Sequence, residues 1–134
     1  MSATSGAAPA AFGRVDAALI ARLRAIAGER VVTAAAVCQQ HGSDESYHRG
    51  HAPDVVVSAA STDEVAQILR LCSRHRIAVV PYGAGTSLEG HVSAVHGGVC
   101  IDLSAMNQVH AVRPDDMDAS VQAGISREAL NRQL

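Results

Sequence analysis

The chain has 134 residues, of which 48% are hydrophobic and 2% aromatic, so it can form one domain with an aliphatic core. The formal net charge is −2 and the eleven basic residues are all arginines spread along the chain, which argues against a nucleic-acid-binding protein. No apolar run approaches the roughly 18 residues that a membrane span needs, and residues 1–11 lack the basic start and apolar centre of a signal peptide.

The N-terminal part is expected to comprise a disordered leader at 1–14 and a helical extension at 15–50. Asp16 can cap a helix that runs to about residue 27, and Gly28 supplies its stop. A short strand at 31–32 and a short helix at 34–40 are expected to follow.

Residues 41–53 predict a polar loop. It contains five side chains that could ligate a metal ion: His41, Asp44, Glu45, His48 and His51. Their spacing matches no tetrahedral zinc signature. We therefore expect a loop that contacts the following domain, with a metal site as the alternative.

The next segment predicts a strand–helix–strand unit. Residues 55–57 form an apolar run of strand type, and Ser61 with Glu64 forms a capping box in which Glu64 reaches back to the start of the helix. Residues 77–80 predict the second strand, which Pro81 should end. The connection should be right-handed and the two strands parallel. The buried face of the helix is expected to carry Val65, Ile68, Leu69 and Cys72.

A glycine-rich loop follows this strand and reads Pro-Tyr-Gly-Ala-Gly-Thr-Ser-Leu-Glu-Gly-His over residues 81–91. Glycines allow positive φ and close approach of a ligand to the main chain, and successive N–H groups in such a turn bind anions. The loop therefore predicts a cradle for a phosphate or diphosphate. A Walker A loop is excluded because the chain has no lysine, and a Rossmann fingerprint because Leu88 stands where the third glycine is needed. A plain glycine-rich connection between strands is the alternative.

The C-terminal part predicts short strands at 99–103, 109–112 and 119–123, whose short links favour an antiparallel meander with the cradle at the junction. Ser126 can cap a last helix. No stop signal precedes Leu134, so we expect a truncated protein or partial gene product. Cys38, Cys72 and Cys100 lie in apolar contexts and are expected to be buried thiols in a reducing compartment.

Three stretches in this order carry a resemblance to a known family: residues 81–91, His96-Gly97-Gly98 with the run to Asn107, and Val121 to Ile125. The chain resembles the flavin-binding half of FAD-linked oxidases of the vanillyl-alcohol oxidase / p-cresol methylhydroxylase (PCMH) type. Within that superfamily it is most similar to the D-lactate dehydrogenase (cytochrome) and glycolate oxidase FAD-subunit group. The segment from Asp44 to Asp54 also resembles the one that leads into that domain, so the resemblance covers roughly residues 40–134. The resemblance implies an α+β fold: an incomplete PCMH-type FAD-binding domain at 51–134, with a small parallel α/β subdomain followed by the start of an antiparallel β subdomain.

The same resemblance implies FAD as cofactor and ten residues that contact it. These are Pro81, Tyr82, Gly83, Ala84, Gly85, Thr86, Ser87, Gly90, His91 and Gly124. Some members attach the flavin covalently through a histidine of the glycine loop, but Thr86 occupies that position here, so we expect non-covalent FAD. Ala59 stands where a proline is frequent, which departs from the family pattern.

The resemblance implies the N-terminal, FAD-diphosphate-binding part of a flavin-dependent oxidoreductase that acts on a 2-hydroxy acid such as D-lactate or glycolate. Its partners would be that small molecule and the missing C-terminal part of the same protein, and its location cytoplasmic or peripheral to a membrane. No catalytic residue is assigned, and these 134 residues alone are expected to be inactive. The alternatives are a non-catalytic remnant and a phosphate-binding module without redox activity.

Overall fold

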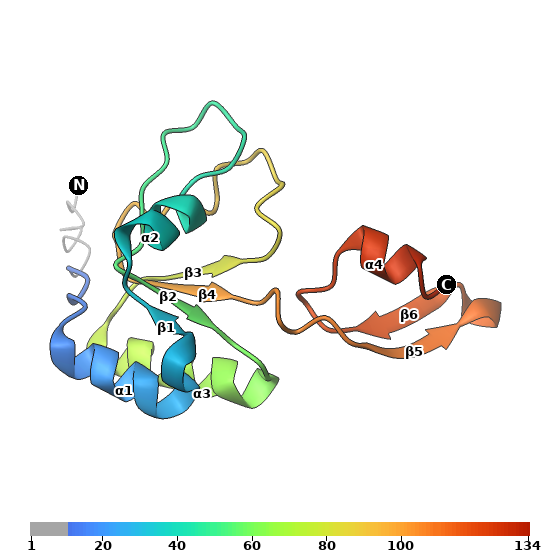
Figure 1. Ribbon diagram of the computed structural model, residues 1–134, viewed down its shortest axis with the longest axis horizontal. Helices are drawn as coiled ribbons and strands as arrows, with labels where there is room; N and C mark the ends of the chain where they lie inside the picture. Colours follow the sequence, from blue (N-terminus) through green and yellow to red (C-terminus); the bar gives the residue numbers. More distant parts are fainter. Residues whose placement is uncertain (1–10) are drawn as a thin grey trace, which may run out of the picture.

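The computed structural model describes residues 11–134 and has two parts joined by one connection (Figure 1). The first part is a four-stranded sheet with helices on both faces, and the second is a two-stranded hairpin with one short helix. The elements in chain order are α1 Ala17–Ala27, η1 Gly28–Arg30, β1 Val31–Val32, α2 Ala35–His41, β2 Val55–Ser58, α3 Thr62–His75, β3 Val79–Tyr82, β4 Val99–Asp102, β5 Val109–Arg113, η2 Pro114–Asp116, β6 Asp118–Val121 and α4 Arg127–Asn131. This build confirms the predicted α+β class.

The four-stranded sheet has the order β1-β2-β4-β3. β1 is antiparallel to β2, whereas β2, β4 and β3 are mutually parallel. Val99 pairs with both Val55 and Val79, so β4 lies between the two strands of the predicted strand–helix–strand unit. The prediction that β4 opens an antiparallel meander is therefore wrong. The long loop at 83–98 acts as the crossover between the parallel strands β3 and β4.

Alternation along the strands builds a core on each face of the sheet. Val55, Val57 and Ile101 point to the face that α1 and α3 cover, where they pack with Leu23 and Ile68. Val56 and Cys100 point to the other face, where Cys38 of α2 meets them. The strands are buried on both sides, as parallel strands normally are.

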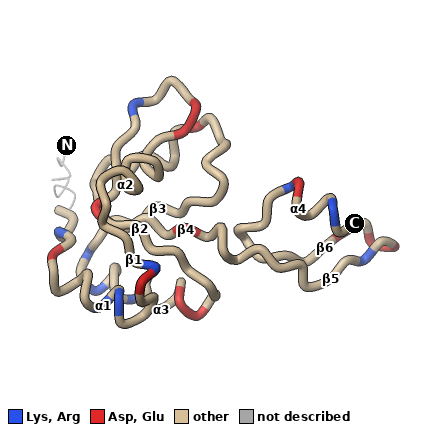
Figure 2. The backbone as a smooth tube through the Cα atoms, viewed as in Figure 1, with Lys and Arg blue, Asp and Glu red and all other residues tan. Residues whose placement is uncertain are grey.

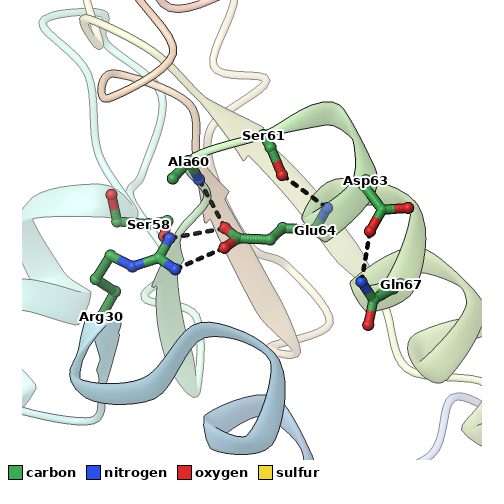
Figure 3. A network of polar contacts seen from close by, with 7 residues as sticks. All are labelled: Arg30, Ser58, Ala60, Ser61, Asp63, Glu64 and Gln67. Carbon is green, nitrogen blue, oxygen red and sulfur yellow. Dashed lines mark hydrogen bonds and ion pairs between the residues drawn. The ribbon is translucent and has the colours of Figure 1, made fainter.

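The ends of the two long helices follow their sequence signals closely. The Asp16 carboxylate accepts the N–H of Leu19 at 2.8 Å, and Gly28 ends α1 at φ 58°. Ser61 Oγ accepts the N–H of Glu64 at the start of α3, as predicted (Figure 3). The Glu64 carboxylate reaches back to the N–H of Ala60, one residue before the predicted partner.

Two expectations for this region are wrong. Leu69 is 45% exposed, because the core side of α3 runs through Ile68 and Cys72. Pro81 does not end the strand: it pairs with Ile101 inside β3, which begins at Val79. β3 is an edge strand, where a residue without an N–H can stand on the open side.

The second part contains β5 and β6, which pair antiparallel around η2, and α4. Ser126 Oγ accepts the N–H of Ala129 and caps α4, as predicted. The predicted meander is thus a hairpin, and the junction between the two parts lies at residues 103–108 rather than at the glycine loop.

Two further observations concern the described chain as a whole. Arginines and acidic residues are interspersed along it (Figure 2). No helix within residues 11–134 is both long and apolar enough to cross a bilayer. Most of the expected leader lies outside the described residues, but Gly13 is described and donates its N–H to the Arg76 carbonyl at 2.9 Å.

Candidate functional site

The glycine loop leaves the carboxyl end of β3 and forms a cavity of about 210 Å³. The cavity is lined by Gly83, Ala84, Gly85, Thr86, Ser87, His91 and Val92. Gly85 adopts φ +66°, a conformation that glycine takes without strain. Within residues 11–134, the N–H groups of residues 84–87 donate no hydrogen bond to the protein. Four consecutive donors therefore remain available beside one cavity.

Tyr82 packs closely against Gly85. A Cβ on Gly85 would collide with the phenol oxygen of Tyr82, so the tyrosine lies directly against the glycine backbone. The Tyr82 ring packs in turn on His41, with 4.4 Å between ring centroids. Tyr82 thus lies between the glycine loop and His41.

His41 joins α2 to the end of β4. Its Nε2 lies 3.2 Å from Asp102 Oδ2 and its Nδ1 lies 2.9 Å from the Val37 carbonyl oxygen. Burial acts to raise the pKa of Asp102, but hydrogen bonds from Ser104 and His41 outweigh it and hold that pKa below its ordinary value. Burial, followed by the Asp102 charge, raises the pKa of Tyr82. His41 therefore belongs to the last turn of α2, not to the polar loop in which the sequence placed it.

The second half of the loop is bonded differently. The N–H of Leu88 donates to Glu89 Oε2, and that of Gly90 donates to Asp44 Oδ2, both at 3.0 Å. Ser87 Oγ lies 3.1 Å from His91 Nδ1 and ties the two halves together. Gly90 needs its φ of +72° for the turn, but its N–H is already occupied by a carboxylate. Its expected contact with a ligand is therefore not available through the backbone N–H in this conformation.

A second cavity of about 240 Å³ lies where the two parts of the molecule meet. Its lining is Gly83, Ala84, Ser104, Asn107, Gly124, Ser126 and Ala129. Gly83 and Ala84 line both cavities, so the structure brings Gly124 and the cradle together across about forty residues of sequence. A Cβ on Gly124 would clash with the Leu103 carbonyl oxygen. The two backbone segments pack so closely here that only glycine fits.

Sequence reasoning missed Ser104 and Asn107. They follow the buried strand β4 directly, and polar residues at the carboxyl end of a parallel strand are a recognised signal for a ligand site. That signal was hidden because β4 was expected to be antiparallel. Pro81, by contrast, was expected at the site but is exposed and lines neither cavity.

The remaining residues that could serve chemistry are dispersed. Across residues 11–134 no three His, Cys, Asp or Glu side chains gather in a way that could hold a metal ion. All three cysteines are buried free thiols, as expected. Ala59 is fully buried and donates its N–H to the Asp102 carbonyl at 2.9 Å, a bond that a proline at this position could not make.

The chain is similar to known proteins both in sequence and in fold. Residues 53–134 match the FAD binding domain family. The chain is 42% identical over 117 residues to a probable mitochondrial D-lactate dehydrogenase of Danio rerio, covering 87% of this chain and 24% of that protein. It is 38% identical over 73 residues to glycolate oxidase subunit GlcD of Bacillus subtilis, covering 54% and 16%.

Solved structures agree on the fold. Substrate-bound p-cresol methylhydroxylase superposes with a TM-score of 0.77 at 21% identity, over 87% of this chain and 24% of that one. The chain thus spans about a quarter of the length of such relatives. The expected resemblance and the expected cofactor type are confirmed at the level of the family. By its matched residues and its fold, the chain belongs to the FAD binding domain family.

Proposed function

We propose that this chain is the FAD-diphosphate-binding part of a flavin-dependent oxidoreductase that acts on a 2-hydroxy acid such as D-lactate or glycolate. The relatives named D-lactate dehydrogenase and glycolate oxidase subunit support the substrate class. Because those relatives are about four times as long, the activity belongs to a longer polypeptide of which this fold is one part.

One observation carries the proposal: the N–H groups of residues 84–87 make no hydrogen bond within residues 11–134 and belong to residues that line a cavity. A diphosphate carries two negative charges, and charge-assisted hydrogen bonds are roughly twice as strong as neutral ones. The chain offers no lysine, so backbone donors and the hydroxyls of Thr86 and Ser87 would neutralise those charges. The donor set therefore fits a diphosphate without a cation.

Residue roles follow from these positions. Gly83 to Ser87 bind the diphosphate, His91 supports Ser87, and Gly124 closes the far side of the second cavity. Tyr82 packs against Gly85, and Pro81 and Gly90 shape the ends of the loop. FAD, when bound, accepts the two electrons released when a 2-hydroxy acid is oxidised to a 2-oxo acid. The residues of this chain bind and orient it.

The 134 residues alone are expected to bind FAD weakly, because hydrogen bonds in a cradle that is open to water gain little net energy. The binding test therefore uses two ligand pairs at high ligand concentration. Isothermal titration should show heat with FAD and with ADP, but not with riboflavin or adenosine, which lack the diphosphate. Gly83→Val is the matched variant, because no atom lies within 4 Å of a Cβ at this position and the side chain would enter the space shared by both cavities. It should weaken FAD and ADP binding while thermal unfolding stays unchanged. Equal binding of ADP and adenosine would refute the cradle.

The substrate class requires the remaining sequence. A chimera that joins residues 1–134 to the complementary part of the Danio rerio relative should bind flavin and reduce an artificial acceptor with D-lactate or glycolate. If the chain is a non-catalytic remnant, the chimera should be colourless because it binds no flavin. If the chain is a phosphate-binding module without redox activity, it should bind ADP but no flavin. The unmodified relative serves as the activity control.

We propose that the flavin is held non-covalently, because Thr86 has no nucleophilic ring nitrogen. Acid precipitation of the flavin-loaded chimera should release all yellow colour into the supernatant. Flavin fluorescence on the denatured band in a gel would contradict this and direct attention to His91.

The partner proposed for the second part is further sequence of the same polypeptide. An apolar hollow of about 410 Å³ lies on the hairpin and α4, beside Met117, which is 93% exposed, and Leu134, which is 70% exposed. Exposed apolar surface of this kind favours association. Light scattering should show self-association of the 134 residues and a discrete species for the chimera.

A cytoplasmic or membrane-peripheral location is proposed as well, and fractionation of expressing cells tests it.

A further inference from the structure

We propose that Asp44 is a positioning residue that fixes the far half of the glycine loop through residues 42–52, here called the clasp. The expected effect of Asp44 on FAD binding rests on the proposed function. The fixing of the loop by Asp44 does not. The clasp and the glycine loop run side by side above the sheet (Figure 1), and the contacts below join them.

The clasp is itself a closed and fixed loop. The N–H of His51 donates to the Gly42 carbonyl at 2.9 Å and closes its two ends. Asp44 Oδ1 accepts both the N–H of Ser46, at 3.0 Å, and its hydroxyl, at 2.5 Å. These bonds orient the carboxylate and lower the pKa of Asp44, chiefly through the Ser46 hydroxyl, so it is ionised at neutral pH. Its second oxygen, Oδ2, is left to accept the N–H of Gly90 at 3.0 Å.

Other contacts extend the attachment to residue 94. The N–H of Ala94 donates to the His51 carbonyl at 2.8 Å. Ser93 Oγ donates to the Arg49 carbonyl at 3.1 Å and lies 2.8 Å from His51 Nδ1. The His48 ring lies so close to Gly90 that a Cβ there would collide with it. The clasp thus covers one side of residues 90–94.

This attachment divides the glycine loop into two functional halves. Residues 84–87 keep free N–H groups, whereas Gly90 gives its own to a carboxylate. A negative charge at that point also repels an anion, so a diphosphate is confined to the first half. The clasp precedes the matched family region at 53–134.

Hydrogen exchange on the 134-residue chain without flavin tests the structural part. In Asp44→Ala the Gly90 amide should exchange on the order of tenfold faster, since one hydrogen bond is lost. In Asp44→Asn it should exchange at a rate between those of wild type and Asp44→Ala, because the single amide oxygen can accept either the Gly90 N–H or the Ser46 groups but not both. Glu45→Ala is the matched control: an exposed neighbouring carboxylate that makes no hydrogen bond within the described residues. It should leave Gly90 unchanged.

The β4 amides report whether each variant is folded. If Asp44→Ala unfolds the chain, Ser46→Ala replaces it, because loss of the anchoring hydroxyl should also speed exchange at Gly90. Unchanged exchange at Gly90 in the folded alanine variant, or in Ser46→Ala, would overturn the proposal. Equal acceleration in Asp44→Asn and Asp44→Ala would do so as well.

Titration with FAD and ADP tests the functional part. Asp44→Ala should weaken both by about fivefold, since the loop loses its far support, while Asp44→Asn should bind equally or more tightly because a repelling charge is gone. Weaker binding in Asp44→Asn than in Asp44→Ala would contradict the proposal. If the wild-type chain binds neither ligand while the exchange pattern is as expected, the proposed flavin site is refuted and the role of Asp44 in holding the loop still stands.

Discussion

Arg30 and Glu64 form a two-point ion pair in which Nη1 meets Oε2 and Nη2 meets Oε1, each at 2.7 Å (Figure 3). Arg30 also donates to the Ser58 carbonyl at 2.8 Å, and the N–H of Ala60 donates to Glu64. The pair therefore joins η1, the end of β2 and the start of α3. Its side chains are 38% and 19% exposed, so solvent screens the pair only in part.

Glu64→Gln should lower the free energy of unfolding by about 1–2 kcal/mol, because the glutamine amide is uncharged and has a single acceptor oxygen, so it cannot reproduce the bidentate pair with Arg30. Urea unfolding followed by circular dichroism measures the change. Asp63→Asn is the control, since the one side-chain hydrogen bond of Asp63 within residues 11–134 comes from Gln67 on the exposed side of the same helix. An equal loss in both variants would show that general helix charge, not the Arg30 pair, is responsible.

The same pair predicts how stability depends on pH. Hydrogen bonding from Arg30, against the opposing effect of burial, lowers the pKa of Glu64 from 4.5 to about 2. A carboxyl whose pKa is lower in the folded than in the unfolded state stabilises the fold above the unfolded value. That contribution is lost as pH falls from about 4.5 to about 2. The stability difference between wild type and Glu64→Gln should therefore shrink across this range, and a constant difference would contradict the assignment.

Gly85→Ala should destabilise the glycine loop, and with it FAD binding, because φ +66° is strained for alanine and the methyl group would meet Tyr82. We expect a loss of about 1–2 kcal/mol in unfolding free energy. Gly83→Ala is the matched control for stability, since a Cβ there enters open space. Thermal unfolding compares the two, and equal stability would mean that the loop relaxes freely.

The buried thiols should be unreactive in the folded chain. Burial raises the pKa of Cys72 to about 11, and burial with the nearby Asp102 raises that of Cys100 to about 12. Burial also raises the pKa of Cys38. Since the thiolate is the nucleophile, iodoacetamide at neutral pH should label the cysteines only after denaturant is added. Mass spectrometry counts the labels, and rapid labelling of a cysteine in the native chain would contradict this prediction.

Local signals predicted helices α1 and α3 well, because Asp16, Ser61 and Gly28 act through bonds to their own neighbours. The resemblance supplied the two-part fold, and the glycine pattern marked a segment that lines a cavity after β3. Local signals failed where pairing is non-local. Nothing in the residues at 99–102 reports that they pair with both Val55 and Val79, and the partnership with Asp44 depends on a segment some forty-six positions before Gly90. For the same reason Ser104 and Asn107 were invisible until the position of β4 was known.

The place of β4 in the sheet also sets an order of events during synthesis. β2 and β3 never pair with each other, and the strand that joins them follows β2 by 99 − 55 = 44 residues. A chain emerging from the ribosome therefore carries β2, which is paired only with β1, and β3, which has no strand partner, until β4 is released. Open strand edges of this kind recruit other chains. Ribosome-bound chains in which β4 is not yet synthesised should bind chaperones. Chains long enough for residues 99–102 to have left the ribosomal exit tunnel should release them.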